Sequence, residues 1–369
     1  MMKYELDFIG VNEETKDADA IGIHWIENDI HTIGVYDGGF SSHGTTLKSI
    51  IDRFYFTENK TDIDFVICSH SDQDHASGLK TIIENTTVKK LYMNRPWLYI
   101  DALYEKISDG RITKNSLEER LKKTYKFIEE LESLATEKGV EICEAFEGTV
   151  INDKLTILHP NKETYISLIV ESNKTDFLEM NADEKDLFTI MKNSLSLSFK
   201  KIYNWITETW TGESLKEDVS TSAENETSII IVGDMGKEKF LLVGDAGVKA
   251  LNAANEYYNS FIGTLKDDIK IYQIPHHGGR HNINSSTLDT IIGPVVAENT
   301  TTDKQAYVCA GKNSDHPLKM VKNAFIRRGV KVYVASGQTI NHHIEIPSRN
   351  GWVTVKNHDF SNEVEEWEE

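Results

Sequence analysis

The chain reads DFVICSHSDQDH at residues 64–75. The first five letters form a short, mostly apolar run that is typical of a buried strand. The following letters supply His70, Asp72, Asp74 and His75. Two imidazoles and two carboxylates at the carboxyl end of a strand form a dense set of nitrogen and oxygen ligands for metal ions. Four such residues at this spacing argue against a polar turn with incidental histidines, so the segment predicts a metal-binding loop.

Further ligands are expected downstream, because a single loop cannot enclose two metal ions. Asp245 follows the apolar run at residues 241–243, where it would lie at a strand end and could bridge two metals. A simple turn is the alternative for a Gly-Asp pair after a strand. His159 follows another strand candidate, which ends at Leu158, and is either a ligand or a structural histidine.

Two adjacent histidines provide the remaining ligand candidates. His276 and His277 follow a strand candidate at residues 269–274. Gly278 and Gly279 come directly after them and allow the backbone to approach closely. An isolated pair of this kind is either a metal-binding pair or a surface feature, so its meaning depends on the other ligands.

Strands and helices alternate around these residues, which indicates a layered α/β fold. The clearest helix spans residues 116–138, where Ser116 with Glu119 matches a capping box and Gly139 stands just past the end. Short β-prone runs recur along the chain at residues 20–26, 32–36, 90–93, 140–143, 155–158, 228–232 and 240–243.

Residues 161–222 interrupt this rhythm and are interpreted as an insertion in a single domain of residues 1–369. The stretch mixes polar loop with helical segments around residues 187–210. We expect it to act as a lid, a specificity element or an interface for a homodimer or protein partner. Trp205 and Trp210 are expected to pack against the main domain or a second subunit rather than to stack on a base.

The composition limits the class of protein. The 369 residues carry a net charge of −19, which argues against tight nonspecific binding of duplex DNA. No apolar stretch approaches the roughly 20 residues of a membrane span, and no signal peptide is recognisable. Three scattered cysteines suit a reduced, cytoplasmic setting. The acidic residues 360–369 are expected to form a solvated tail.

Taken together, the ligand motifs resemble the metallo-β-lactamase superfamily. They are His70-x-Asp72-x-Asp74-His75, Gly244-Asp245 and Pro275-His276-His277-Gly278. The closest likeness is to the soluble domain of ComEC-type competence proteins, and it covers most of the chain outside the insertion. It extends to peripheral motifs, namely Asp19-Ala20, Asp37-Gly38-Gly39, Asn225-x-x-Ser228, Asn313-x-x-His316-Pro317 and Gly337.

The resemblance implies an αββα sandwich with the metal loops along one edge. His70 and Asp72 would bind one metal ion, and Asp74 and His75 would bind the other. Asp245 would bridge the two. The commoner loop of the superfamily has histidine where Asp72 stands, and this harder oxygen ligand makes Mn²⁺ a rival to Zn²⁺.

One of the adjacent histidines would complete the second metal site. We favour His277 as the ligand and His276 as a contact to the substrate. The chain departs from the ComEC-type pattern nearby: Gln273 stands where lysine is usual, and Arg280 lies in a loop that usually continues with serine. Because a lysine there could neutralise a phosphate, its loss weakens the assignment of the substrate. Arg280 could supply a charge instead, or be a surface arginine.

The resemblance further implies hydrolysis of a phosphodiester by a hydroxide held between two divalent cations. The substrate would be a single-stranded nucleic acid or a nucleotide. Asp74 or Asp245 could receive a proton, and His316 could contact the leaving group or a non-bridging oxygen, with a structural role as its alternative. Other readings are a hydrolase for a choline phosphodiester or a lactone, and a non-catalytic interaction module.

Overall fold

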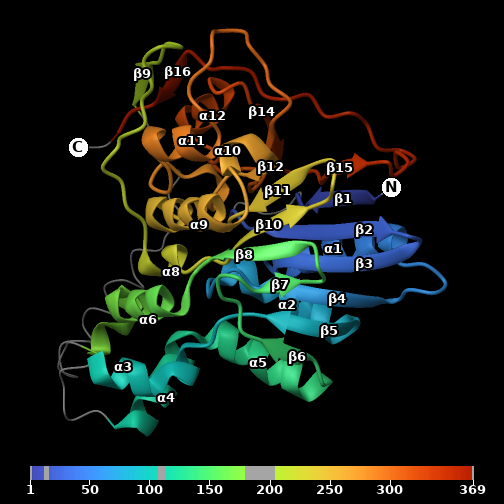
Figure 1. Ribbon diagram of the computed structural model, residues 1–369, viewed down its shortest axis with the longest axis vertical. Coiled ribbons are helices and arrows are strands. Elements are labelled where there is room, and N and C mark those ends of the chain that lie inside the picture. The colour runs from blue at the N-terminus through green and yellow to red at the C-terminus, as the bar shows by residue number, and fades with distance from the viewer. Residues whose placement is uncertain (1, 12–15, 107–112, 179–203, 368–369) are drawn as a thin grey trace.

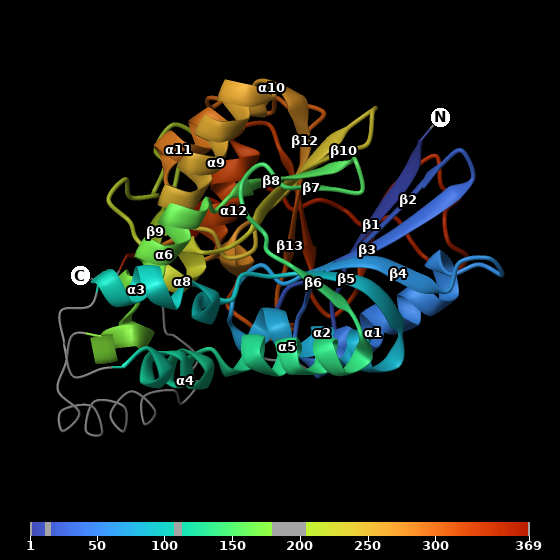
Figure 2. The same ribbon diagram turned by 60° about the horizontal axis from the view of Figure 1, so that its bottom comes forward.

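Two seven-stranded sheets pack face to face and carry helices on their outer faces, which confirms the αββα sandwich (Figure 1). The computed structural model describes residues 2–11, 16–106, 113–178 and 204–367. The layers are separated most clearly in the turned view, where helices lie above one sheet and below the other (Figure 2).

The first sheet has the order β15-β1-β2-β3-β4-β5-β6. Its strands are antiparallel from β15 to β3 and parallel from β3 to β6. Helices α1 (Ser41–Ile50), α2 (Gln73–Asn85) and α5 (Lys126–Lys138) cover its outer face. The strands are β1 (Lys3–Phe8), β2 (Ala20–Glu27), β3 (Ile30–Gly38), β4 (Asp62–Ile67), β5 (Thr87–Tyr92), β6 (Glu141–Cys143) and β15 (Ile340–Ile344).

The second sheet has the order β14-β13-β12-β11-β10-β8-β7. It is parallel from β14 to β11 and antiparallel beyond. Helices α9 (Val248–Phe261), α11 (Ser285–Ile291) and α12 (Lys319–Ile326) cover it. The strands are β7 (Val150–Ile151), β8 (Leu155–His159), β10 (Ile230–Asp234), β11 (Lys239–Leu242), β12 (Ile269–Gln273), β13 (Gln305–Cys309) and β14 (Lys331–Ala335).

The buried apolar side chains divide into three clusters, one for each space between neighbouring layers. Phe65 and Leu242 belong to the cluster between the sheets. Leu79 lies in the cluster under the helices of the first sheet, and Leu251 in that of the second. Strands buried on both faces therefore appear as continuous apolar runs, as at residues 65–68.

The helix expected at residues 116–138 is two helices, α4 (Lys114–Thr124) and α5. Tyr125 separates them, with backbone angles φ −100° and ψ 47° that are not helical. The side chain of Thr113 caps α4 by accepting a hydrogen bond from the backbone N–H of Ser116, so the predicted capping box at Ser116 is wrong. Gly139 ends α5 with φ 70°, as predicted.

Helices from two separate parts of the chain gather at one end of the molecule (Figure 1). They are η2 (Pro96–Tyr99), α3 (Ile100–Lys106), α4, α6 (Lys162–Glu171) and η3 (Asn173–Leu178). The short helix α8 (Ala223–Glu226) joins this group to β10. Most of the helical segment expected at residues 187–210 lies outside the described residues.

The stretch at residues 204–210, part of the expected insertion, contacts the rest of the chain. It forms a short strand, β9 (Trp205–Thr207), where a helix was expected. Glu208 is buried and pairs with the equally buried Arg327 at 3.1 Å. The Trp210 indole donates to the carbonyl of Val296, in line with the expected packing. Trp205 is 52% exposed within one chain, and Nζ of Lys319 lies 4.2 Å from the centre of its ring, so packing against a second subunit stays a prediction.

The acidic end of the chain is not a solvated tail over residues 360–367. Its strand β16 (Glu363–Glu365) pairs with β9. Val364 is completely buried against the helical layer of the second sheet. The carboxylate of Glu365 accepts hydrogen bonds from the backbone N–H groups of Lys319 and Met320, which open α12. One apolar side chain and one helix cap thus anchor a segment that composition alone marks as polar.

No helix in the described part of the chain combines the length and the apolar character that crossing a membrane requires.

Candidate metal centre

Five segments bring imidazoles and carboxylates to one edge of the sandwich. Asp19 precedes β2, and His70 follows β4. His75 lies in the first turn of α2, and Asp245 follows β11. His277 lies in the short turn η4 (His276–Gly278) after β12. Because β4, β11 and β12 all end at this edge, the loops that follow them meet there, as expected for such strands.

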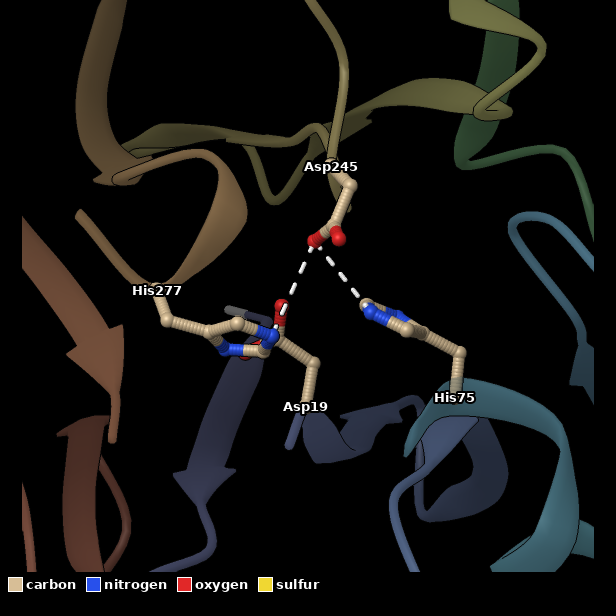
Figure 3. Close-up of side chains that lie close together, drawn as sticks. All are labelled: Asp19, His75, Asp245 and His277. Atoms are coloured by element: carbon tan, nitrogen blue, oxygen red, sulfur yellow. Dashed lines mark ion pairs between the residues drawn. The ribbon is translucent and has the colours of Figure 1, made fainter. Parts of the chain in front are cut away.

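Four of these residues form a compact group (Figure 3). Ligand atoms of Asp19, His75, Asp245 and His277 all lie within 4.8 Å of one another. Oδ1 of Asp245 is 3.2 Å from Nε2 of His75 and 3.9 Å from Nε2 of His277. All four residues are buried, and their side chains point toward a common centre.

Five buried atoms in and beside this group have no hydrogen-bond partner among the described residues. They are Nε2 of His70, His75 and His277 and Oδ1 of Asp19 and Asp245. A buried polar atom without a partner costs about 1–3 kcal/mol, so five together would be a heavy penalty in a purely structural cluster. Mixed imidazole and carboxylate donors in this arrangement fit a divalent cation.

The opposite nitrogen of each imidazole is held by the protein. Nδ1 of His75 donates to Oδ2 of Asp37 at 2.9 Å, and Nδ1 of His277 donates to the carbonyl of Cys309 at 3.1 Å. Nδ1 of His70 is 3.0 Å from Oγ of Ser69. Such partners fix the ring orientation and leave Nε2 available to a metal ion.

Asp245 presents its two oxygens to two different sets of side chains. Oδ1 faces His75 and His277, as described above. Oδ2 lies 3.8 Å from Nε2 of His70 and 3.2 Å from Nδ1 of His276. The Asp245 carboxylate therefore lies between two pairs of imidazoles.

The charges of the cluster are strongly coupled. Burial opposes a charged His75, yet the carboxylates of Asp245 and Asp37 raise the pKa of its imidazole well above the usual value. Against the same penalty, Asp19 and Asp245 raise the pKa of His277 to about 10. Burial raises the pKa of Asp19 to about 7. The carboxylates thus draw positive charge into the cluster, which protons supply and a divalent cation could supply instead.

Asp74 lies beside this group, whereas Asp72 points elsewhere. Oδ2 of Asp74 is 3.6 Å from Nε2 of His277 and 4.0 Å from Nε2 of His75. Oδ1 of Asp72 pairs with Nζ of Lys174 at 2.5 Å, on the partly exposed side of the loop. The structure therefore brings Asp74 to the cluster and does not bring Asp72 to it.

The other predicted residues occupy distinct places. Nε2 of His159 hydrogen-bonds the backbone carbonyl of Glu226 at 2.9 Å, away from the group of ligand atoms. His276 has a side chain that is 34% exposed, and its Nδ1 lies 2.7 Å from Nδ2 of Asn225. Nδ1 of His316 is 2.8 Å from the Asp17 carboxylate.

The two residues that depart from the ComEC-type pattern are both committed to partners within the protein. Gln273 is buried, and its side chain donates to Oδ2 of Asp19 and accepts from the backbone N–H groups of Val243 and Gly244. A lysine in this place would meet Asp19 rather than a substrate. Arg280 is also buried and donates to the backbone carbonyl of Glu366, so it holds the C-terminal strand.

Asp19 and Asp37 are the site residues that the ligand motifs do not single out. Asp19 contributes an oxygen directly to the cluster, and Asp37 orients His75. Both precede or end strands far from the 70–75 loop in the sequence, and only their place in the peripheral motifs marked them. Ser228, in another of those motifs, accepts a hydrogen bond from the backbone N–H of Asp245.

Comparison with known proteins adds little to this geometry. No family model and no curated protein matches the chain. Among solved structures, the chain is similar to Igni18, a metallo hydrolase from the hyperthermophilic archaeon Ignicoccus hospitalis, with 13% identity, a TM-score of 0.40 and coverage of 93% of this chain and 100% of that one. It is also similar to Zn²⁺-bound PqqB from Methylobacterium extorquens, with 9% identity, a TM-score of 0.38 and coverage of 91% and 99%. Likenesses this distant carry no conclusion about chemistry.

Proposed function

We propose that this chain is a metal-dependent hydrolase that cleaves phosphodiester bonds with two divalent cations, Zn²⁺ or Mn²⁺. The observation that carries the proposal is a set of five buried nitrogen and oxygen atoms at one edge of the sandwich that have no hydrogen-bond partner among the described residues. A structural cluster of this kind would be costly, whereas a metal site needs such atoms free.

The residues divide into two sets around Asp245. One set is His75, His277 and Asp19, with Asp74 at its border. The other is His70 with the second oxygen of Asp245, and His276 at its exposed side. Cations bound there would lower the pKa of a bound water toward neutrality and stabilise charge on phosphoryl oxygens.

The partly exposed side chains at the rim have roles of their own. The carboxylate of Asp74 is 29% exposed and can accept the proton that the attacking water loses. His276, at 34% exposure, is placed to donate a hydrogen bond to a substrate oxygen. Both lie next to buried ligands, so they border the cluster on the side open to solvent.

The choice of a phosphodiester is supported by the sequence resemblance to ComEC-type domains. The net charge of −19 favours a short substrate over a long polyanion, so a nucleotide or a short single strand suits the chain better than duplex DNA. A choline phosphodiester or a lactone is the competing substrate class, because the same cluster could polarise either.

A substrate panel tests the proposal. Protein reconstituted with Mn²⁺ or Zn²⁺ is expected to hydrolyse bis(p-nitrophenyl) phosphate and a dinucleotide, and the matched variant Asp245→Asn is not. Hydrolysis of a lactone alone would reject the phosphodiester, and hydrolysis of nothing, with metal bound, would reject the enzyme. Activity on an oligonucleotide that falls steeply with salt would identify a polyanion as the substrate.

A further inference from the structure

Asp17 organises the loop that carries His316. Its carboxylate accepts hydrogen bonds from the backbone N–H of Gly311 at 2.9 Å, from Oγ of Ser314 at 2.8 Å and from Nδ1 of His316 at 2.8 Å. The Asp17 side chain is only 16% exposed. Three donors on one nearly buried carboxylate fix both the loop and the imidazole.

The same segment also reaches the metal cluster. Asp19, two residues further on, supplies one of the buried ligand oxygens, and its backbone N–H donates to the carbonyl of Asp74 at 3.2 Å. On the other side, the backbone N–H of Leu318 donates to the carbonyl of Gly278 at 3.2 Å, directly after His277. His316 is therefore held from two sides next to the cluster.

Only one nitrogen of His316 remains for a ligand. Nδ1 is committed to Asp17, whereas Nε2 has no hydrogen-bond partner within the described ranges. The side chain is 28% exposed, so it can exchange protons with solvent. A carboxylate on Nδ1 is the arrangement that orients a histidine whose other nitrogen transfers a proton.

We propose that Asp17 is a positioning residue that holds His316 so that Nε2 protonates the leaving-group oxygen. This inference rests on the proposed function and assigns His316 to the leaving group rather than to a non-bridging oxygen. As the oxygen of water bonds to phosphorus, the bond from phosphorus to the leaving oxygen breaks and its electron pair stays on that oxygen. The proton of Nε2–H moves to this oxygen, the alcohol departs, and solvent reprotonates Nε2. Asp74 takes the proton that the water loses.

The dependence on the leaving group tests this role. Two diesters are compared: bis(p-nitrophenyl) phosphate, whose leaving group needs no proton, and a dinucleotide, whose alkoxide does. His316→Ala is expected to lower kcat on the dinucleotide by about 100-fold or more, and on the p-nitrophenyl diester by only a few-fold. Asp17→Asn is expected to follow the same pattern at about tenfold. Metal content should stay unchanged in both variants.

A matched control lies next to the histidine. Asp315→Asn makes the same chemical change beside His316, and Asp315 takes no part in the contacts described above. It is expected to leave both activities as they are. Equal losses on both diesters in Asp17→Asn would mean that Asp17 only supports the loop. Equal losses in His316→Ala would place Nε2 on a non-bridging oxygen. Either result overturns the proposal.

A spectroscopic measurement separates this inference from the proposed function. In ¹⁵N-histidine-labelled protein, the Nδ1 proton of His316 is expected to be protected from exchange and to be lost from the spectrum in Asp17→Ala. If that proton is absent in the wild type, the positioning role is wrong even when both diesters are cleaved. If the wild type cleaves neither diester, the proposed function fails, and the leaving-group role fails with it.

Discussion

At the scale of single residues, Asp245 has the most demanding position in the molecule. It is buried, one of its oxygens has no hydrogen-bond partner among the described residues, and four imidazoles lie within 4 Å of the carboxylate. Burial opposes its negative charge, but His276, His75 and His277 lower the pKa of the carboxyl well below its usual value. Its charge is therefore maintained, as a ligand for a divalent cation requires.

Two conservative substitutions distinguish Asp245 from Asp72, the aspartate of the 70–75 loop that lies outside the cluster. Asp245→Asn removes the charge between the two sets of imidazoles, and under the proposed function we expect phosphodiester hydrolysis to fall at least about 1,000-fold, because bound divalent cations would supply most of the rate. Asp72→Asn leaves the cluster intact, since Asp72 pairs with Lys174, and is expected to change the rate by less than about tenfold. Initial rates at saturating metal measure both. A larger loss in Asp72→Asn than in Asp245→Asn would reverse the assignment.

The stability of the metal-free protein should depend on pH in a distinctive way. His277 has an ordinary pKa of 6.5, and the cluster raises it to about 10. The extra proton stabilises the folded state fully below pH 6.5, and this contribution is lost as the pH rises through 10. Asp19, with its pKa raised to about 7, acts in the same direction.

We therefore expect the Tm of protein in a chelator to fall between pH 6.5 and 10, and to fall less in His277→Gln. With saturating Mn²⁺ the trend should reverse, because cations compete with protons for the same imidazoles. Thermal melts across this range measure the effect. A chelated protein that gains stability toward pH 10 would show that His277 is not protonated in the folded state.

At the scale of elements, strand ends explain the position of the cluster, and the C-terminal strand holds the start of the helix that follows the His316 loop. The loops after β4, β11 and β12 carry His70, Asp245 and His277. On the far side of the second helical layer, β16 pairs with β9 and its Glu365 caps α12, the helix that follows the His316 loop. The C-terminal segment thus holds the start of α12 in place.

Removing the anchor of β16 should weaken the whole domain. Val364 has no exposed surface, so Val364→Ala is expected to lower the free energy of unfolding by about 1–3 kcal/mol. Glu363→Gln, an exposed neighbour in the same strand, should change it by less than about 0.5 kcal/mol. Urea unfolding followed by tryptophan fluorescence gives both values. An unchanged midpoint for Val364→Ala would mean that β16 frays in solution.

At the scale of the whole molecule, the layered fold could be predicted because its signals are local. Apolar runs that end in polar ligands identified β4 and β11, and the alternation of strands and helices indicated the layers. Asp19 carries no such signal, because an aspartate before a strand is ordinary until the fold brings it to His277. The pairing of β9 with β16 depends on one buried valine in an acidic segment, which composition alone describes as solvated.

The direction of single side chains was likewise beyond local patterns. Spacing within residues 70–75 marks Asp72 as a ligand, but its partner Lys174 comes from η3, a different part of the chain. ComEC-type domains usually have a lysine at the position of Gln273, where it could bind a substrate. In this fold the side chain at position 273 points toward Asp19. Contacts between distant segments decide both cases.

Anomalous diffraction from crystals grown with Mn²⁺ tests the central claim most directly, since it locates each bound ion. We expect one peak bordered by His75, His277 and Oδ1 of Asp245, at about 2.0–2.2 Å from the ligand atoms, and a second bordered by His70 and Oδ2 of Asp245. An empty map at these four side chains, at saturating metal, would contradict a metal-dependent hydrolase.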